Sequence, residues 1–199
     1  MSEGLVNKAQ YHFERLNDII NGSKVPVPLS LELQITNICH QACYYCNSEI
    51  FRNHNPDKAT TKDWIDFIDK LPEGINDVTF SGGGEPLDHL EADRIINYVL
   101  HKGYKVGLIT NGARFRYLNF TKEYKPSWIG IDFDSADPDT YFKIRKGNLE
   151  KVKKSIVNAI LHKNILSNQK IYNEKNKSEL NWEMCGKSLK KIYLDLLKK

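Results

Sequence analysis

The spacing of apolar residues predicts helices and strands that alternate along most of the chain. Apolar residues recur at helical spacing in four segments, which are residues 3–20, a helix capped by Thr61 and ended by Pro72 and Gly74, a helix through Leu90, Ile95, Ile96, Val99 and Leu100, and residues 149–162. Short runs that alternate or are rich in β-branched residues predict four strands, at residues 29–35, 77–81, 105–110 and 128–133. Alternation of this kind predicts an α/β fold with a parallel sheet and right-handed crossovers.

The pattern stops after Lys163. The following residues are polar and rich in asparagine, and helical spacing returns only in the last segment, residues 188–199. We therefore predict three parts: an N-terminal helix (residues 1–24), an α/β core (25–163) and a polar, basic C-terminal tail that ends in a helix (164–199).

Composition narrows the class of protein. With 40% apolar and 27% charged residues the chain is typical of a globular protein. It has no run of about 20 apolar residues that could span a membrane, and its first residues are too polar for a secretory signal, so we expect a cytoplasmic location and no membrane partner. In a reducing compartment, clustered cysteines favour metal binding or redox chemistry over disulfides.

The net charge of +4 is unevenly distributed. Residues 1–148 hold 17 basic and 20 acidic residues, whereas residues 149–199 hold 12 basic and 5 acidic ones. The lysines of the tail lack the arginine and aromatic residues that nucleic-acid surfaces favour, so we expect a solvated face and no nucleic-acid partner.

An unusual segment follows each predicted strand. These segments are the cysteine-containing residues 39–46, SGGGEP (81–86), TNG (110–112) and DFDS (132–135). Because the carboxyl ends of parallel strands lie on one side of a sheet, we expect the four segments to surround one ligand. Three glycines in a row indicate close approach of the backbone to a ligand or a tight turn, and Glu85 beside Pro86 adds a carboxylate suited to an ammonium group.

Cys39, Cys43 and Cys46 form a CxxxCxxC motif. Three thiolates on one loop can hold an iron-sulfur cluster, or, with His40 or His54 as a fourth ligand, zinc. The spacing favours the cluster, because structural zinc motifs usually have two pairs of ligands. Cys185 stands far from the motif and is interpreted as a lone thiol.

The order CHQACYYC, SGGGEP, TNG and WIGIDFDSADPDTYFKIRKG resembles the radical S-adenosylmethionine (radical SAM) enzymes, over residues 25 to about 162. The resemblance is greatest to the branch that modifies peptides and small molecules. It implies a partial (β/α) TIM-like barrel with at least four βα units and a 4Fe-4S cluster held by Cys39, Cys43 and Cys46. The fourth coordination position would belong to S-adenosylmethionine.

The resemblance also assigns residues to S-adenosylmethionine. Gly83, Gly84 and Glu85 match the segment that engages the methionyl amine. Thr110 and Asn111 match polar side chains near the ribose or carboxylate, although a simple Thr-Asn-Gly turn would have the same sequence.

Tyr45 matches an aromatic residue near the adenine, and its alternative is packing on the loop. Arg145 matches a basic residue that pairs with the methionyl carboxylate, and its alternative is a surface arginine on a helix. Asp134 matches an aspartate of the family, but Asp132 stands where the family often has serine, and a carboxylate there would repel the methionyl carboxylate unless it faces elsewhere.

These matches imply an enzyme that cleaves S-adenosylmethionine reductively and abstracts hydrogen from a small-molecule or peptide substrate. An external flavodoxin-like or ferredoxin-like protein would supply the electron. Three alternatives stay open: an activating enzyme that makes a glycyl radical on a partner protein, a non-catalytic module that binds the cluster and S-adenosylmethionine, and a zinc-site domain. The sequence assigns no separate acid, base or nucleophile, and the family's last two strands have no clear counterpart in residues 164–199.

Overall fold

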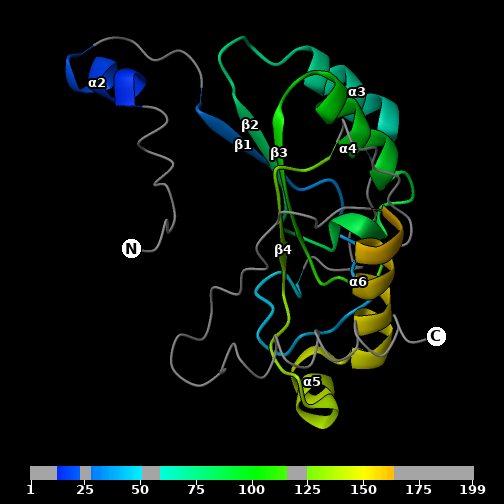
Figure 1. Ribbon diagram of the computed structural model, residues 1–199. Helices are drawn as coiled ribbons and strands as arrows, with labels where there is room; N and C mark the ends of the chain where they lie inside the picture. The colour runs from blue at the N-terminus through cyan, green and yellow to red at the C-terminus, as the bar shows by residue number, and fades with distance from the viewer. Residues whose placement is uncertain (1–12, 23–27, 51–58, 116–124, 164–199) are drawn as a thin grey trace.

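The computed structural model describes residues 13–22, 28–50, 59–115 and 125–163. Its elements, in chain order, are α2 (Phe13–Ile20), β1 (Ser30–Leu33), α3 (Thr61–Asp69), β2 (Asp77–Phe80), the 3₁₀ helix η1 (Pro86–Asp88), α4 (Ala92–His101), β3 (Lys105–Thr110), β4 (Trp128–Ile131), α5 (Pro138–Arg145) and α6 (Leu149–Lys163). Figure 1 shows the strands side by side, with α3 and α4 next to one another.

The four strands form one parallel sheet in the order β1-β2-β3-β4. Leu33 pairs with Phe80, Phe80 with Leu108, and Leu108 with Ile129. The α/β prediction is therefore confirmed, and the arrangement of strands and helices is that of part of a TIM-like barrel. All four strands end on the same side of the sheet, where the unusual segments begin.

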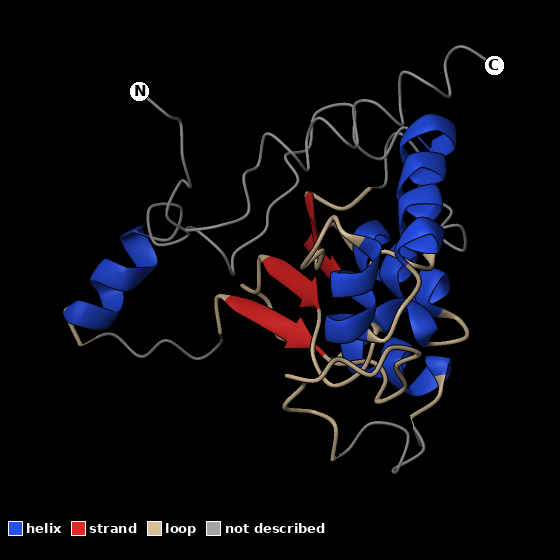
Figure 2. Ribbon diagram, turned by 90° about the horizontal axis from the view of Figure 1, so that it is seen from below, coloured by secondary structure: helices blue, strands red, loops and turns tan. Residues whose placement is uncertain are grey.

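The core lies between the sheet and its helices. Figure 2 shows the helices α3, α4 and α6 on one side of the strands. Helix α4 buries Ile95, Ile96 and Val99 at helical spacing, and β2 and β3 bury Phe80 and Leu108 completely. The loops at the carboxyl ends of the strands lie outside this contact between helices and sheet. None of the helices among the described residues is long and apolar enough to cross a membrane.

Two predicted helix boundaries were wrong. Helix α3 is capped by Thr60 rather than Thr61, because the hydroxyl of Thr60 accepts the Asp63 amide while the Asp63 carboxylate accepts the Thr60 amide. Thr61 is the first helical residue and donates its hydroxyl to Glu91 at 2.6 Å. Leu90, predicted to lie in the next helix, precedes it and is 99% exposed, because η1 intervenes.

The first and last strands are shorter than predicted, and β2 ends one residue early, at Phe80. β1 stops at Leu33, although Ile35 is still buried, and β4 stops at Ile131 instead of residue 133. β1 loses its pairing partner after Leu33, because β2 ends at Phe80 and the chain turns at Gly82, which has a φ of +88°. The buried positions of a strand therefore extend beyond its paired positions.

Several predictions fall outside the described residues. These are the first part of the N-terminal helix, His54, Cys185 and the helix of residues 188–199. The division into three parts also stays a prediction.

The glycine turn (residues 81–86) packs directly against the backbone of the cysteine loop (residues 36–49). The Gly84 amide donates to the carbonyl of Thr36 at 2.9 Å, and the Glu85 amide donates to the carbonyl of Ile38 at 2.8 Å. A Cβ atom on Gly84 would lie 2.2 Å from the carbonyl oxygen of Ile38. The glycine is therefore required by a neighbouring loop, in addition to any ligand.

We predict that Gly84→Ala destabilises the chain by about 1–3 kcal/mol, because the added methyl group would force two backbone segments apart. Gly130→Ala is the matched control, since its Cβ would have its nearest neighbour, the Trp128 ring, at 3.4 Å. Urea denaturation of both variants measures the difference. Equal stability of the two variants would contradict the close packing of the loops.

Candidate functional site

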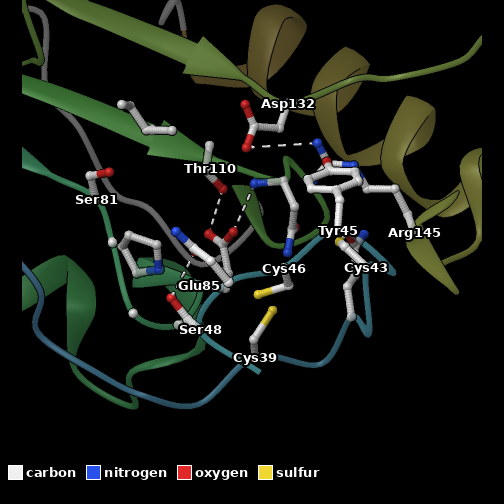
Figure 3. Close-up of a pocket in the computed structure, with 18 residues that line it drawn as sticks. Cys39, Cys43, Tyr45, Cys46, Ser48, Ser81, Glu85, Thr110, Asp132 and Arg145 are labelled. Atoms are coloured by element: carbon white, nitrogen blue, oxygen red, sulfur yellow. Dashed lines mark hydrogen bonds and ion pairs between the residues drawn. The ribbon is translucent and has the colours of Figure 1, made fainter. Parts of the chain in front are cut away.

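A cavity of about 390 Å³ lies at the carboxyl ends of the strands. Its lining comes from all four segments that the sequence singled out, and includes Cys39, Gly83, Thr110 and Asp132. Figure 3 shows Cys39, Thr110 and Asp132 around a common space. The predicted convergence of the four segments is thus what the structure shows, and the volume is within the range of small-molecule sites.

The three cysteines of the motif all line this cavity. Cys43 is buried, and Cys39 and Cys46 are half-buried. The loop that carries them is fixed by backbone bonds to the end of α5, where the amides of Ala42 and Tyr44 donate to the carbonyls of Arg145 and Ile144 at 3.3 and 3.0 Å. The cysteine loop is therefore hydrogen-bonded to the end of α5 as well as to the glycine turn.

Burial raises the pKa of the Cys39 thiol to about 12, and the nearby carboxylates of Glu85 and Asp88 act in the same direction. A thiol in such surroundings needs a cationic partner to become a thiolate. No group of three His, Cys, Asp or Glu side chains within the described ranges is arranged to hold a metal ion.

His40 does not line the cavity, and its Nδ1 lies 2.7 Å from the carboxylate of Asp88. Three cysteines face the cavity without this histidine, which speaks against the zinc site with His40 as its fourth ligand.

Glu85 is a buried carboxylate that connects two of the loops. Its Oε1 accepts the hydroxyl of Thr110 at 2.5 Å and the amide of Leu87 at 3.2 Å, and its Oε2 accepts the amide of Asn111 at 2.7 Å. Burial raises its pKa to about 7, although the hydrogen bonds from Asn111, Thr110 and Leu87 oppose the shift. The carboxylate predicted to meet an ammonium group therefore also fixes the end of β3.

Asn111 lines the cavity and has one buried donor without a partner among the described residues. Its Oδ1 accepts the amide of Ala113 at 3.0 Å, but its Nδ2 is buried and has no hydrogen-bond partner among the described residues. Thr110, by contrast, uses its hydroxyl within the protein, donating to Glu85 and accepting from the Gly112 amide. A buried amide without a partner costs free energy, so Asn111 is suited to a ligand that accepts a hydrogen bond.

Tyr45, Asp134 and Arg145 form one connected group. The Tyr45 hydroxyl and the Arg145 Nε each donate to Asp134 Oδ2 at 2.5 Å, and the guanidinium lies 5.7 Å from the centre of the Tyr45 ring. Tyr45 and Arg145 line the cavity, whereas Asp134 is not among its lining residues. Asp134 thus holds the two side chains in place.

Arg145 is only 4% exposed, so the alternative of a surface arginine is wrong. Burial alone would lower its pKa, but the hydrogen bond to Asp134 and the charges of Asp134 and Asp132 raise the pKa above its usual value. The pKa of Tyr45 is raised by burial and by its bond to Asp134.

Asp132 lies at the edge of the same cavity. Its side chain is exposed, and its carboxylate lies 3.7 Å from Nη2 of Arg145. Figure 3 shows this pair above the cysteines. The only cation among the described residues that line the cavity therefore faces two carboxylates.

Sequence reasoning missed several lining residues, among them Gln41, Ser48 and Ser81. Gln41 is buried and donates from Nε2 to the hydroxyl of Tyr141 at 3.1 Å. Its position between two cysteines was the available signal, since a buried amide there has to serve the loop or the ligand.

Comparison with known proteins gives a family match. The family model described as the radical SAM superfamily matches residues 33–165. The chain is 35% identical over 136 residues to a probable GTP 3′,8-cyclase of Methanococcus maripaludis, which covers 66% of this chain and 45% of the relative. It is 30% identical over 143 residues to the antilisterial bacteriocin subtilosin biosynthesis protein AlbA of Bacillus subtilis, which covers 67% of this chain and 31% of the relative.

Among solved structures, the fold is similar to Streptococcus suis SuiB bound to the precursor peptide SuiA. The TM-score is 0.57 at 16% identity, over 88% of this chain and 41% of that one. The chain thus spans less than half the length of these relatives.

We predict a pH dependence of stability that depends on Glu85. A glutamate with a pKa raised from 4.5 to about 7 holds its proton in the folded chain after the unfolded chain has lost it. The folded state then binds more protons between these two values, so stability falls as the pH rises through this window. In Glu85→Gln the side chain cannot ionise, and the free energy of unfolding should fall less.

Urea denaturation at several pH values between these limits measures the two slopes. Glu91→Gln is the control, because Glu91 is exposed and the hydrogen bonds from Thr61 and Arg94 lower its pKa. Identical slopes for the wild type and Glu85→Gln would contradict the raised pKa.

Proposed function

The chain belongs to the radical SAM superfamily, and from this premise we propose that it is an enzyme that cleaves S-adenosylmethionine reductively with a 4Fe-4S cluster and abstracts hydrogen from an organic substrate. The observation that carries the proposal is the convergence of Cys39, Cys43 and Cys46 on the cavity that is also lined by the glycine turn and by Asn111. The family uses both cofactors.

The chemistry of the three thiols fits an iron-sulfur cluster, although their side chains are not already arranged around one metal ion. Three thiols face one cavity, and soft thiolate ligands suit iron-sulfur centres. The raised pKa of Cys39 means that this thiol stays protonated without a strong cationic partner, and iron supplies such a partner. We propose Cys39, Cys43 and Cys46 as the ligands.

The residues present also fit S-adenosylmethionine. At neutral pH this cofactor carries a sulfonium, an ammonium and a carboxylate, hence a net positive charge. The cavity offers the carboxylates of Glu85 and Asp132 against the guanidinium of Arg145, and the buried Nδ2 of Asn111 lacks an acceptor among the described residues. A cationic cofactor with hydrogen-bond acceptors suits both features.

We assign the parts of the cofactor to the residues that match the family. The glycine turn at Gly83, Gly84 and Glu85 would receive the methionyl amine, and Thr110 and Asn111 would lie near the ribose or carboxylate.

Tyr45 would lie near the adenine. Arg145 would reach the methionyl carboxylate with the part of its guanidinium that Asp134 leaves open, since Asp134 takes Nε.

When bound, the cluster would supply the electron for the reductive cleavage of S-adenosylmethionine, which starts hydrogen abstraction from the substrate. The chain's own residues orient the cofactor and limit access of water. Gln41, Cys43 and Glu85 are buried along the cavity, so the protein keeps one side of it dry. The electron would come from an external flavodoxin-like or ferredoxin-like protein.

We favour a peptide substrate over a nucleotide. The relatives include probable GTP 3′,8-cyclases, a nucleotide dehydratase and a protein of bacteriocin biosynthesis. A nucleoside triphosphate brings several negative charges, which require free cations in its site. Among the described lining residues the one cation, Arg145, faces Asp134 and Asp132 and is assigned to S-adenosylmethionine, so these residues offer no further cation to a triphosphate.

The test of the proposed chemistry is direct. Chain reconstituted with iron and sulfide without oxygen, then given dithionite and S-adenosylmethionine, should release 5′-deoxyadenosine, measured by liquid chromatography. Cys46→Ser should reduce the yield at least about a hundredfold, because one cluster ligand is lost. Cys185→Ser is the matched control and should behave as the wild type.

Two results would contradict the proposal. No 5′-deoxyadenosine from a chain with a full complement of iron would favour the non-catalytic module. Zinc without acid-labile sulfide would favour the zinc domain.

We predict that Asp132 weakens binding of nucleotides. Asp132→Asn keeps the side-chain size and removes one exposed charge, so the affinity for GTP should rise about threefold. Asp77→Asn serves as the control, because Asp77 begins β2 and lies at the end of the strand opposite the cavity. Calorimetric titration at low salt measures the constants, and equal affinity of all three proteins would contradict the electrostatic argument.

A further inference from the structure

Asp88 is a buried carboxylate that lies outside the cavity of the cysteines. Its side chain is 1% exposed, yet it contacts two basic side chains from two other loops. Its Oδ2 accepts the backbone amide of His40 at 2.7 Å and lies 2.7 Å from His40 Nδ1. Its Oδ1 accepts Nε of Arg114 at 2.6 Å. We call these three residues the Asp88 clamp.

The clamp joins three segments that carry the proposed site. His40 directly follows Cys39, Asp88 ends η1 behind the glycine turn, and Arg114 follows the Thr-Asn-Gly segment after β3. In the same three segments, Glu85 makes the connections on the cavity side. Glu85 and Asp88 lie at the two ends of one short 3₁₀ turn, so the same turn fixes both carboxylates.

The contact with the backbone of His40 bears directly on Cys39. The amide of His40 belongs to the peptide group whose carbonyl comes from Cys39, so a hydrogen bond at this amide limits rotation of the peptide next to the thiol. A buried, charge-assisted hydrogen bond is stronger than an exposed one, because water does not compete. The carboxylate of Asp88 is close enough to act on the charge of the Cys39 sulfur.

We propose that Asp88 is a positioning residue for Cys39, which fixes the first cysteine of the motif from behind and thereby sets the retention and the reduction potential of the metal centre. Ligand residues of metal sites commonly depend on such outer contacts, and loss of one typically lowers metal affinity or activity 10- to 100-fold. The inference rests on the proposed function only in its metal readouts, since the clamp itself is present in the protein.

The test compares Asp88→Asn with the wild type. Asparagine has the same shape, but its NH₂ group is a donor. It cannot accept the hydrogen bonds that His40 and Arg114 both donate to Asp88. Hydrogen exchange followed by mass spectrometry, on the full chain without iron, should show exchange of residues 38–42 at least about tenfold faster, because the lost bond involves a charged acceptor. Unchanged exchange would overturn the proposal.

Two further measurements use the reconstituted chain. Loss of iron to a chelator should be at least about tenfold faster in Asp88→Asn. The midpoint potential, followed by electron paramagnetic resonance, should shift to more positive values, because a negative charge near the centre is removed. Faster exchange with wild-type iron retention and potential would reduce Asp88 to a purely structural residue and overturn the proposal.

Asp69→Asn is the matched control. Asp69 is also ion-paired, to Lys102 at 2.5 Å, and accepts the hydroxyl of Tyr98 at 2.7 Å, but it joins α3 and α4 away from the cavity. It should change none of the three readouts.

Arg114→Gln provides a milder variant, because the Arg114 side chain is 40% exposed and lines a separate cavity of about 350 Å³ beside Asp88. It should give intermediate effects even if Asp88→Asn folds poorly, and wild-type behaviour of Arg114→Gln in all three readouts would count against the clamp. A wild-type chain that takes up no cluster would contradict the proposed function, whereas the exchange experiment would still decide whether Asp88 holds Cys39.

Discussion

The buried carboxylate of Glu85 is the contact on which the arrangement of the site depends. It ties the glycine turn to the end of β3 through Thr110 and Asn111, while its own amide bonds to Ile38 at the start of the cysteine loop. A carboxyl group without water is costly unless it is hydrogen-bonded, so the loops can come together only with these bonds in place. The parallel sheet brings the loops near one another, and Glu85 sets their relative positions.

The architecture could be predicted because the strands and helices follow from the periodic spacing of apolar residues. β3 has the predicted bounds, and the buried positions of α4 follow the spacing of Ile95, Ile96 and Val99. The four segments that line the cavity were also predictable, because strand ends in a parallel sheet share one side. The errors concern the ends of elements, where the capping box of Thr60 sets the start of α3 and the 3₁₀ helix η1 delays the start of α4 beyond Leu90.

The contacts among the site residues could not be predicted in the same way. The burial of Arg145 depends on Asp134, which does not itself line the cavity. The Asp88 clamp joins residues 48 positions apart. No periodic pattern encodes pairs of this kind. The glycines show the same limit, since Gly84 is required by the carbonyl of Ile38, a neighbour that the local sequence does not identify.

The contacts of the cysteine loop with α5 determine when the site can be completed. Gln41 meets Tyr141, 100 residues further along the chain, and the amides of Ala42 and Tyr44 use carbonyls at Arg145 and Ile144. During synthesis the cysteines emerge first, and for the time needed to make those residues the thiols have no finished scaffold. Incorporation of a metal centre therefore belongs to the end of folding, after translation has passed α5, and a delay at that stage leaves the thiols open to oxidation.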